Sequence, residues 1–426
     1  MMRKLLVISI DSMVTEDLPI IKGLPNMGKI LAHSSLVRRM ESTYPTLTHA
    51  IHAGIITGCY PERHGIICNE QFQPGILSPP WYEEASCLKV PTLLDIAASK
   101  GLKTASICWP LTLHANLPLI VHRAGIRIPP EQKRQVAAAR STPGLIDKMA
   151  GELESVWGMP HYEGADRLSY RAAAYLAEHD KPDIMYIHII LIDHLRHVHG
   201  VFSPELSKGY AFLDRELEPL LEAMERAGTL KNTIINFTSD HGHLNVERVC
   251  SLNRFFREQG FLHVDAGGHL IDWNAYAHSC GLSAQIYTKS GNAAEVENLL
   301  TLHQEELGIG EVLLADEVKT RYHVSDGFSF MVETDGKTAF SSDYRAPLFC
   351  TPDSEDYRYS RATHGHQPEK GVQPTFFLYN PFQASPVMLE QGRIIDQAPT
   401  LARLMGFSME HCDGQPIQAL LAGEML

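Results

Sequence analysis

Residues 5–11 read LLVISID, an apolar run that ends in an aspartate. Two later stretches repeat this pattern, DIMYIHIILID at residues 183–193 and TIINFTSD at residues 233–240. Continuous apolar, β-branched runs of this kind are typical of strands buried on both faces of a mostly parallel sheet. Ligands bind beyond the carboxyl ends of the strands in such sheets. We therefore expect one site to collect the aspartates that end these runs, Asp11, Asp193 and Asp240.

Helical patterns separate the runs, and the clearest spans residues 203–228. Ser203 is a candidate N-cap, Pro204 suits the first turn, and Gly228 marks the end. The 3.6-residue periodicity predicts a buried stripe that contains Leu206, Tyr210, Leu213, Leu217 and Leu220. Alternating strands and helices predict an α/β fold with a doubly wound, mostly parallel sheet flanked by helices.

Between residues 256 and 355, short strand-like segments and turns replace the long apolar runs. The pattern of the sheet resumes in PTFFLYNP at residues 374–381. We predict a catalytic core made of residues 1–255 and 356–426, with residues 256–355 inserted as a smaller α+β lobe. Within that lobe, Asp335-Gly336 is expected to turn a hairpin.

The composition describes an ordinary soluble globular protein of 426 residues, 44% of them hydrophobic and 20% charged. The net charge of −13 and the lack of a dense Lys/Arg run argue against nucleic acid polymers as partners. No apolar stretch reaches the roughly 18 residues that a membrane span requires. Eight scattered cysteines without a C-x-x-C pair, and a start unlike a secretory signal, favour reduced thiols and a cytoplasmic location. The oligomeric state stays open.

Candidate metal ligands follow the expected strand ends. Asp193 and His197 are four residues apart, which places both side chains on one face of a helical turn. Asp240 and His241 are adjacent just after a strand, where an irregular backbone can direct both inward. The complete candidate set is Asp11, Asp193, His197, Asp240, His241 and His364.

Carboxylate and imidazole ligands without thiolates suit zinc, with manganese or cobalt as substitutes. Two ions roughly 4 Å apart would stabilise both oxygens of an in-line displacement at phosphorus. Taken singly, each motif is weak, because an Asp-x-x-x-His pair is common in helices. The combination is stronger, since every motif lies at a strand end of one sheet.

Two residues compete for the role of nucleophile. The segment CYPER, residues 59–63, fits the C-x-P-x-R signature under which sulfatases oxidise cysteine to formylglycine. Cys59, however, follows Thr57-Gly58, the expected end of the helix THAIHAGIIT, whereas a sulfatase nucleophile opens a helix. Thr48 opens this helix, where free N–H groups and the dipole favour a phosphate. A threonine hydroxyl needs metal coordination to become nucleophilic, and on this segment alone Thr48 could equally be an N-cap.

These motifs resemble the nucleotide pyrophosphatase/phosphodiesterase family of the alkaline phosphatase superfamily. Members carry a nucleophilic threonine, then T-G-x-Y-P-x-x-H-G-I and an asparagine 21 residues after the threonine; Thr48, residues 57–66 and Asn69 occupy those places. The family's Asp-x-x-x-His, Asp-His-Gly and His-Gly motifs are present at residues 193–197, 240–242 and 364–365. The resemblance covers most of the chain and is least clear in the inserted lobe.

The resemblance implies an alkaline phosphatase-like core with two metal ions. One ion would be held by Asp193, His197 and His364, and the other by Asp11, Asp240, His241 and the Thr48 oxygen. Asn69 would donate a hydrogen bond to a phosphoryl oxygen. Thr48 would attack phosphorus, and hydrolysis of the phospho-threonine would follow.

The sequence departs from the family at four positions. His49 and Ala50 replace the residues that usually follow the threonine, and His366 and Gln367 replace the aromatic-Asp pair after the last His-Gly. These changes put nucleotide preference in doubt. The Trp-Tyr pair at residues 81–82 is a candidate for lining the pocket, or equally for packing under a Pro-rich loop.

Other histidines near these motifs have structural interpretations. We expect His52 to be satisfied within its helix and His64 to brace a turn. His194, His199 and His243 flank the ligand segments, and exposure is the simpler expectation for them than a supporting role.

The sequence thus predicts a two-metal hydrolase that cleaves phosphodiester or pyrophosphate bonds of a small phosphorylated substrate. A phosphonate hydrolase or phosphomonoesterase of the same superfamily is the alternative. A metal-stabilised binding protein is the non-enzymatic alternative, although it would need neither Thr48 nor Asn69.

Overall fold

The computed structural model describes residues 3–125, 128–353 and 356–422. Within them, the central sheet has eight strands in the order β19-β2-β18-β6-β1-β5-β3-β4. β18 is antiparallel to both of its neighbours, and the other pairs are parallel. The strands are β1 (Lys4–Ile10), β2 (Ser35–Glu41), β3 (Thr104–Ile107), β4 (Leu119–Val121), β5 (Ile184–Ile189), β6 (Thr233–Thr238), β18 (Phe376–Tyr379) and β19 (Met388–Arg393). The predicted mostly parallel sheet is confirmed.

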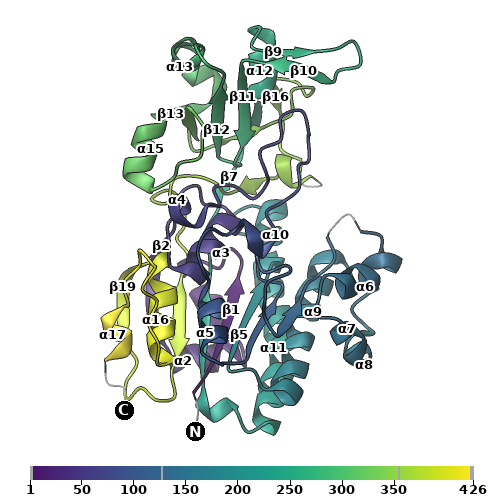
Figure 1. Cartoon of the computed structure of the whole chain (residues 1–426), viewed down its shortest axis with the longest axis vertical. Helices are drawn as coiled ribbons and strands as arrows, with labels where there is room; N and C mark the ends of the chain where they lie inside the picture. Colours follow the sequence, from purple (N-terminus) through teal and green to yellow (C-terminus); the bar gives the residue numbers. More distant parts are fainter. Residues whose placement is uncertain (1–2, 126–127, 354–355, 423–426) are drawn as a thin grey trace.

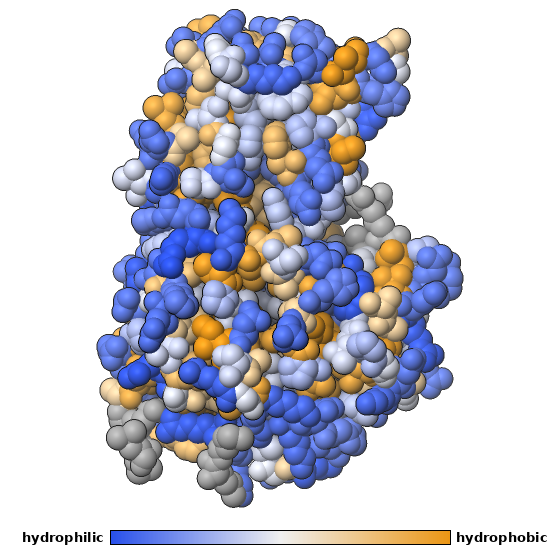
Figure 2. Space-filling view, viewed as in Figure 1, coloured by the Kyte–Doolittle hydropathy of each residue, from blue (hydrophilic) through white to orange (hydrophobic). Residues whose placement is uncertain are grey.

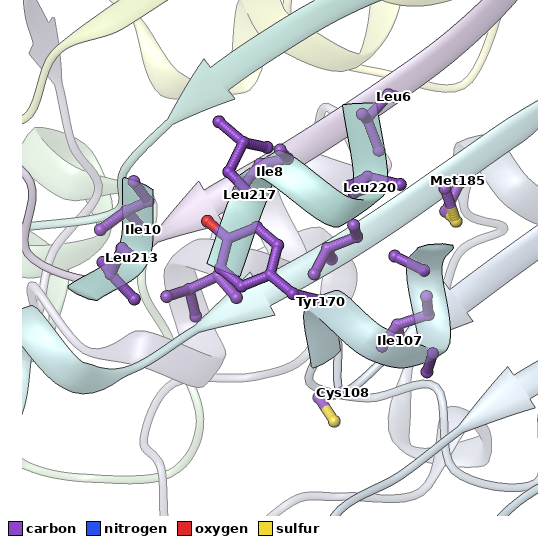
Figure 3. Close-up of a cluster of buried hydrophobic side chains, with 14 of the residues drawn as sticks. Leu6, Ile8, Ile10, Ile107, Cys108, Tyr170, Met185, Leu213, Leu217 and Leu220 are labelled. Carbon is purple, nitrogen blue, oxygen red and sulfur yellow. The ribbon is translucent and has the colours of Figure 1, made fainter. Parts of the chain in front are cut away.

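Helices cover both faces of the sheet, as expected for a doubly wound fold (Figure 1). Alternate side chains of β1 enter two different cores: Leu6, Ile8 and Ile10 lie in one, and Leu5 and Val7 in the other. Figure 3 shows the first core, where β1 packs against helices that carry Tyr170 and Leu213. The helices on that face are α9 (His161–Tyr175) and α11 (Glu205–Arg226), and those on the other are α3 (Thr48–Thr57), α5 (Leu93–Ser99) and α16 (Gln397–Leu404).

The predicted helix at residues 203–228 is α11, and all five residues of its predicted stripe are buried. The helix begins at Glu205, with Pro204 as the N-cap, one position later than expected. Burying five such side chains contributes roughly 1.5–3 kcal/mol each, so packing dominates the stability of this helix.

A second group of sheets lies above the core in Figure 1. A four-stranded sheet has the order β11-β12-β14-β13, and a three-stranded sheet has the order β15-β8-β16. Their strands are β8 (Arg248–Ser251), β11 (Ala275–Ser279), β12 (Ser283–Thr288), β13 (Ile309–Leu314), β14 (Phe330–Thr334), β15 (Thr338–Ser341) and β16 (Phe349–Cys350). The predicted lobe boundary at residue 355 lies outside the described residues.

The prediction of a hairpin at Asp335-Gly336 is wrong. The turn forms, with Gly336 at φ 97°, but β14 pairs with β12 and β13, whereas β15 pairs in parallel with β8. A local turn signal fixes a reversal of the chain and leaves the pairing partner to long-range packing.

The visible surface is mostly hydrophilic, with hydrophobic residues in scattered groups (Figure 2). Among the described residues, no helix is both long enough and apolar enough to cross a membrane.

A buried contact connects the lobe with the loop that precedes α3. The Tyr44 hydroxyl donates to Glu333 Oε2 over 3.0 Å, and Lys370 Nζ lies 3.1 Å from Glu333 Oε1. Burial raises the pKa of Glu333 to about 7, although Lys370 opposes this shift. Because Tyr44 is close to Thr48 in the chain, this contact helps to fix the start of α3.

Replacing Glu333 by glutamine removes this titration. The folded-state pKa, about 7, exceeds the ordinary 4.5, so the folded state binds the proton more tightly and the contribution of Glu333 to stability falls as the pH rises between these values. The quantity to measure is the difference in free energy of unfolding between the wild type and Glu333→Gln. We expect this difference to decrease by up to about 1.4 kcal/mol per pH unit as the pH rises across this window. Urea unfolding at several pH values measures it, and parallel pH profiles would contradict the prediction.

Candidate metal centre

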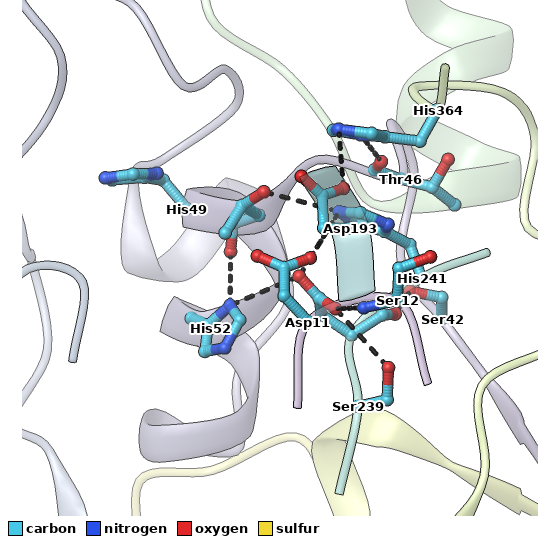
Figure 4. Close-up of polar contacts among 12 residues, drawn as sticks. Asp11, Ser12, Ser42, Thr46, His49, His52, Asp193, Ser239, His241 and His364 are labelled. Carbon is cyan, nitrogen blue, oxygen red and sulfur yellow. Dashed lines mark hydrogen bonds and ion pairs between the residues drawn. The ribbon is translucent and has the colours of Figure 1, made fainter. Parts of the chain in front are cut away.

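Three adjacent parallel strands bring the predicted aspartates to one edge of the sheet. Asp11 directly follows β1, and Asp240 lies two residues after β6. Asp193 lies in the first turn of α10 (Leu191–His199), which follows β5. Figure 4 shows the side chains of Asp11, Asp193, His241 and His364 directed toward one another.

The side chains form two groups, and within each group the ligand atoms lie within 4.8 Å of one another. The Asp11 cluster consists of Asp11, Asp240 and His241. The Asp193 cluster consists of Asp193, His197, His243 and His364. The structure thus brings together all six side chains predicted as ligands, and it adds His243.

The Asp193 cluster has the geometry of ligands around a cation. His197 Nδ1 lies 2.8 Å from the carbonyl oxygen of Ala362, and His364 Nδ1 lies 2.8 Å from that of Thr46. A carbonyl only accepts, so each Nδ1 carries the proton and each Nε2 presents a lone pair. The two Nε2 atoms face Asp193 Oδ1 at 3.5 and 3.9 Å. Lone pairs that face a carboxylate oxygen repel it unless a cation lies between them.

The Asp11 cluster includes the hydroxyl of Thr48. His241 Nε2 lies 3.3 Å from Thr48 Oγ1, 3.5 Å from Asp11 Oδ1 and 3.2 Å from Asp240 Oδ2. Thr48 is the first residue of α3, Leu47 occupies the N-cap position, and no side chain caps this end. The interpretation of Thr48 as an N-cap is therefore wrong, and its hydroxyl is available to the cluster.

Several buried atoms of both clusters have no hydrogen-bond partner among the described residues. They include Asp11 Oδ1, Asp193 Oδ1, Asp240 Oδ2 and His243 Nε2. Buried polar atoms are normally paired, so this concentration fits two divalent cations held by these residues.

Burial and crowding shift the pKa values of Asp11, Asp240 and the buried imidazoles toward their neutral forms, whereas His197 and His243 lower the pKa of Asp193 although burial opposes this shift. Burial, with Asp240 and Asp193 nearby, raises the pKa of Asp11, and burial raises that of Asp240 to about 7. Burial also lowers the pKa of His364 to about 4 and that of His241 well below its ordinary value. Neutral imidazoles and carboxylates that repel one another form a donor set suited to Zn²⁺.

A relay that the sequence did not reveal orients Asp11. Arg123 NH2 lies 3.4 Å from His188 Nδ1, and a guanidinium only donates, so His188 carries its proton on Nε2. That Nε2–H donates to Asp11 Oδ2 over 3.1 Å, which leaves Oδ1 directed to the cluster. The only signal in the sequence is a histidine inside the apolar run of β5.

A cavity of about 530 Å³ opens beside the clusters and is lined by Thr48, Asn69, Trp81 and Arg123. Asn69 Oδ1 accepts the backbone N–H of His49 over 2.8 Å, so its NH₂ group is the part that can donate to a ligand. The Trp81 ring contacts His49 edge-on, with centroids 5.0 Å apart. The described residues that line this cavity include Trp81 but not Tyr82, His366 or Gln367.

Among the three arginines that line the cavity, Arg123 differs from the other two. Arg140 and Arg358 also line it, but Glu83 and Asp356 pair with them at 2.6 Å each. Arg123 has no carboxylate within 4.0 Å in the part of the chain that the structure describes.

Cys59 lies outside this cavity. It follows Gly58, whose φ of 71° ends α3, and its buried thiol donates to the carbonyl of His411. Burial raises the pKa of the Cys59 thiol. Both observations agree with a structural residue and not with the sulfatase interpretation.

The other histidines are partly as expected. His52 is buried and satisfied by the Thr48 carbonyl and by Ser9 Oγ, and His64 Nδ1 accepts the backbone N–H of Ile66 in a turn. His199 is exposed. The expectation for His243 is wrong, because its side chain is buried among the metal-ligand candidates.

Comparison with known proteins places the chain in a family. The type I phosphodiesterase / nucleotide pyrophosphatase family matches residues 5–372. Ectonucleotide pyrophosphatase/phosphodiesterase family member 1 of Mus musculus is 25% identical over 230 residues, 53% of this chain and 21% of that protein. Venom phosphodiesterase of Macrovipera lebetinus is 22% identical over 379 residues, 84% of this chain and 38% of that protein. The chain thus spans well under half the length of these relatives.

Solved structures share the fold at low sequence identity. An inactive variant of murine ectonucleotide pyrophosphatase/phosphodiesterase 5 in complex with AMP superposes with a TM-score of 0.70 at 18% identity, covering 98% of this chain and 99% of that one. Human ectonucleotide pyrophosphatase/phosphodiesterase 5 superposes with a TM-score of 0.69 at 16% identity, covering 98% of this chain and 99% of that one. Since the family matches the chain from its first strand to beyond the last candidate ligand, the chain belongs to the type I phosphodiesterase / nucleotide pyrophosphatase family.

Proposed function

We propose that this protein hydrolyses a phosphodiester or pyrophosphate bond in a small phosphorylated substrate through a phospho-threonine intermediate on Thr48. The observation that carries the proposal is the Thr48 hydroxyl, 3.3 Å from His241 Nε2 at the N-terminus of a buried helix and beside the cavity. Two divalent ions would be held by the two clusters, with Zn²⁺ the best fit and Mn²⁺ or Co²⁺ possible substitutes. The family and its phosphodiesterase relatives support this assignment.

The residues of the chain have distinct roles in the proposed reaction. Bound ions would neutralise phosphoryl charge and lower the pKa of the Thr48 hydroxyl. Thr48 Oγ forms a bond to phosphorus as the bond to the leaving-group oxygen breaks, and water then cleaves the phospho-threonine and restores the hydroxyl. The N-terminus of α3 favours the anion, and the NH₂ group of Asn69 donates to a phosphoryl oxygen.

The cavity favours an anionic substrate with a flat or polar extension. Arg123 offers a cation that has no carboxylate partner among the described residues, and Trp81 offers a ring face beside His49. A structural neighbour binds AMP, which agrees with a nucleotide-like substrate here.

A substrate screen distinguishes the alternatives within the superfamily. With zinc-loaded protein, we expect the turnover of a p-nitrophenyl nucleotide diester to exceed that of p-nitrophenyl phosphate, phosphonoacetate and a sulfate ester. A higher turnover of the monoester or of phosphonoacetate would instead support the corresponding alternative. A higher turnover of the sulfate ester would contradict the assignment of Thr48.

Thr48→Ala tests the nucleophile. We expect diesterase turnover to fall by at least about 10³-fold, because the attacking oxygen is gone, while both metal ions stay bound. Steady-state kinetics and metal analysis of the same preparation measure this. Thr57→Ala is the matched control on the same helix, since the hydrogen bonds of Thr57 Oγ1 among the described residues go to the carbonyl of Ala53 and the N–H of Cys59, away from the clusters. Equal turnover in Thr48→Ala and the control would remove Thr48 from the mechanism.

The position of Asp193 depends on a cap supplied by a distant helix. Asp166 on α9 accepts the backbone N–H groups of Ile190 and Leu191 over 2.8 and 2.9 Å, at the start of α10. A carboxylate at a helix N-terminus also interacts favourably with the helix dipole. Asp166 therefore fixes the turn that carries Asp193 and His197.

Replacing Asp166 by alanine leaves two buried N–H groups unpaired. We expect a loss of about 1–3 kcal/mol in the free energy of unfolding, and a roughly 10–100-fold weaker metal affinity of the Asp193 cluster. Urea unfolding and chelator competition measure the two effects. Asp180→Ala, which breaks a partly exposed pair with Lys103, is the control and should change neither. Unchanged metal affinity in Asp166→Ala would show that the cap does not position these ligands.

A further inference from the structure

His243 is the member of the Asp193 cluster that the motifs of the sequence did not single out. Its side chain is buried, and its Nε2 lies 3.3 Å from Asp193 Oδ1. Despite that distance, neither atom has a hydrogen-bond partner among the described residues. A buried ring nitrogen 3.3 Å from a carboxylate oxygen, a separation longer than that of a good hydrogen bond, is also the arrangement of two ligands of one cation.

We propose that His243 Nε2 is a fourth protein ligand of the metal ion held by Asp193, His197 and His364. The inference rests on the two-metal function proposed above. It makes this site a closed set of three imidazoles and one carboxylate, whereas the Asp11 cluster has two carboxylates, one imidazole and the Thr48 hydroxyl.

The spacing of the atoms fits four-coordinate zinc. Bonds of about 2.0–2.1 Å in a tetrahedral site place neighbouring ligand atoms about 3.3–3.4 Å apart. His243 Nε2 and His197 Nε2 lie 3.3 and 3.5 Å from Asp193 Oδ1, and His364 Nε2 lies 3.9 Å away. His243 therefore meets the expected spacing at least as well as the two predicted ligands do.

The far side of the His243 ring is held as a metal ligand requires. Its Nδ1 lies 2.8 Å from Ser12 Oγ, just as carbonyl oxygens hold the Nδ1 atoms of His197 and His364. Ser12 has a φ of 62°, which is unfavourable for a residue other than glycine. In this conformation its backbone N–H also donates to Asp240 Oδ1 over 3.1 Å, so Ser12 connects the two clusters.

A short pair of strands brings His243 and His364 together. β7 (Leu244–Asn245) pairs with β17 (Ala362–Thr363), and Leu244 lies opposite Thr363. The residues just outside this pairing are His243 and His364, and their ring centroids lie 5.1 Å apart.

The two sites would consequently differ in behaviour. Three imidazoles and a carboxylate close the Asp193 cluster as in structural zinc sites, whereas the fourth ligand of the Asp11 cluster is the hydroxyl of Thr48, a weaker donor than an imidazole. We expect chelators to remove the ion of the Asp11 cluster first and the ion of the Asp193 cluster much more slowly.

Cadmium-113 NMR of protein labelled with ¹⁵N-histidine tests the bond directly, because one-bond cadmium–nitrogen coupling reports only bonded nitrogens. We expect one cadmium coupled to three histidine nitrogens and the other coupled to one. His243→Ala should reduce three to two and leave the other cadmium unchanged. His199→Ala, on the exposed end of α10, is the control and should change neither.

Two coupled nitrogens on the first cadmium in the wild type would overturn the proposal. This count decides the matter even if His243→Ala fails to fold. If the protein cleaves diesters but the cadmium of the Asp193 cluster couples to two nitrogens and that of the Asp11 cluster to one, His243 is excluded as a ligand and the proposed function stays intact. If the two cadmium ions couple to three nitrogens and one nitrogen, but the zinc-loaded protein has no diesterase turnover, His243 is supported as a ligand and the proposed function is contradicted.

Discussion

Three carboxylates, two of them buried, are crowded together at one edge of a sheet, an arrangement that is costly without cations. Two unit charges about 4 Å apart interact by roughly 4 kcal/mol at an effective dielectric constant of 20, and Asp11, Asp193 and Asp240 also lose their hydration. Burial and mutual repulsion raise the pKa values of Asp11 and Asp240 accordingly. Divalent ions would offset this electrostatic and desolvation cost, so metal binding is coupled to the stability of the fold at this edge of the sheet.

The fold makes the crowding unavoidable. β6, β1 and β5 are adjacent and parallel, so their carboxyl ends coincide, and the segments that follow them supply Asp240, Asp11 and Asp193. α3 begins at the same edge with Thr48, and the β7–β17 pair brings His243 and His364 together. The Thr48 hydroxyl thus lies beside the Asp11 cluster, within a scaffold stabilised by two hydrophobic cores.

The sequence was sufficient for features set by local pattern. The apolar runs indicated the parallel strands, and their last residues indicated the carboxylates, because strand direction fixes which end of each run reaches the site. His243, His188 and Asp166 act through contacts with residues far away in the chain, and no local signal marks such partners. The failed hairpin at Asp335-Gly336 has the same origin, since the partner of β15 is β8, far earlier in the sequence.

The central claim is that one metal ion lies in the Asp193 cluster and a second lies in the Asp11 cluster, next to Thr48. Anomalous diffraction at the zinc edge from crystals of the zinc-loaded protein tests it most directly. The account predicts two peaks about 4 Å apart, one at the Asp193 cluster and one at the Asp11 cluster within bonding distance of Thr48 Oγ. A single peak, or peaks away from these residues, would contradict it.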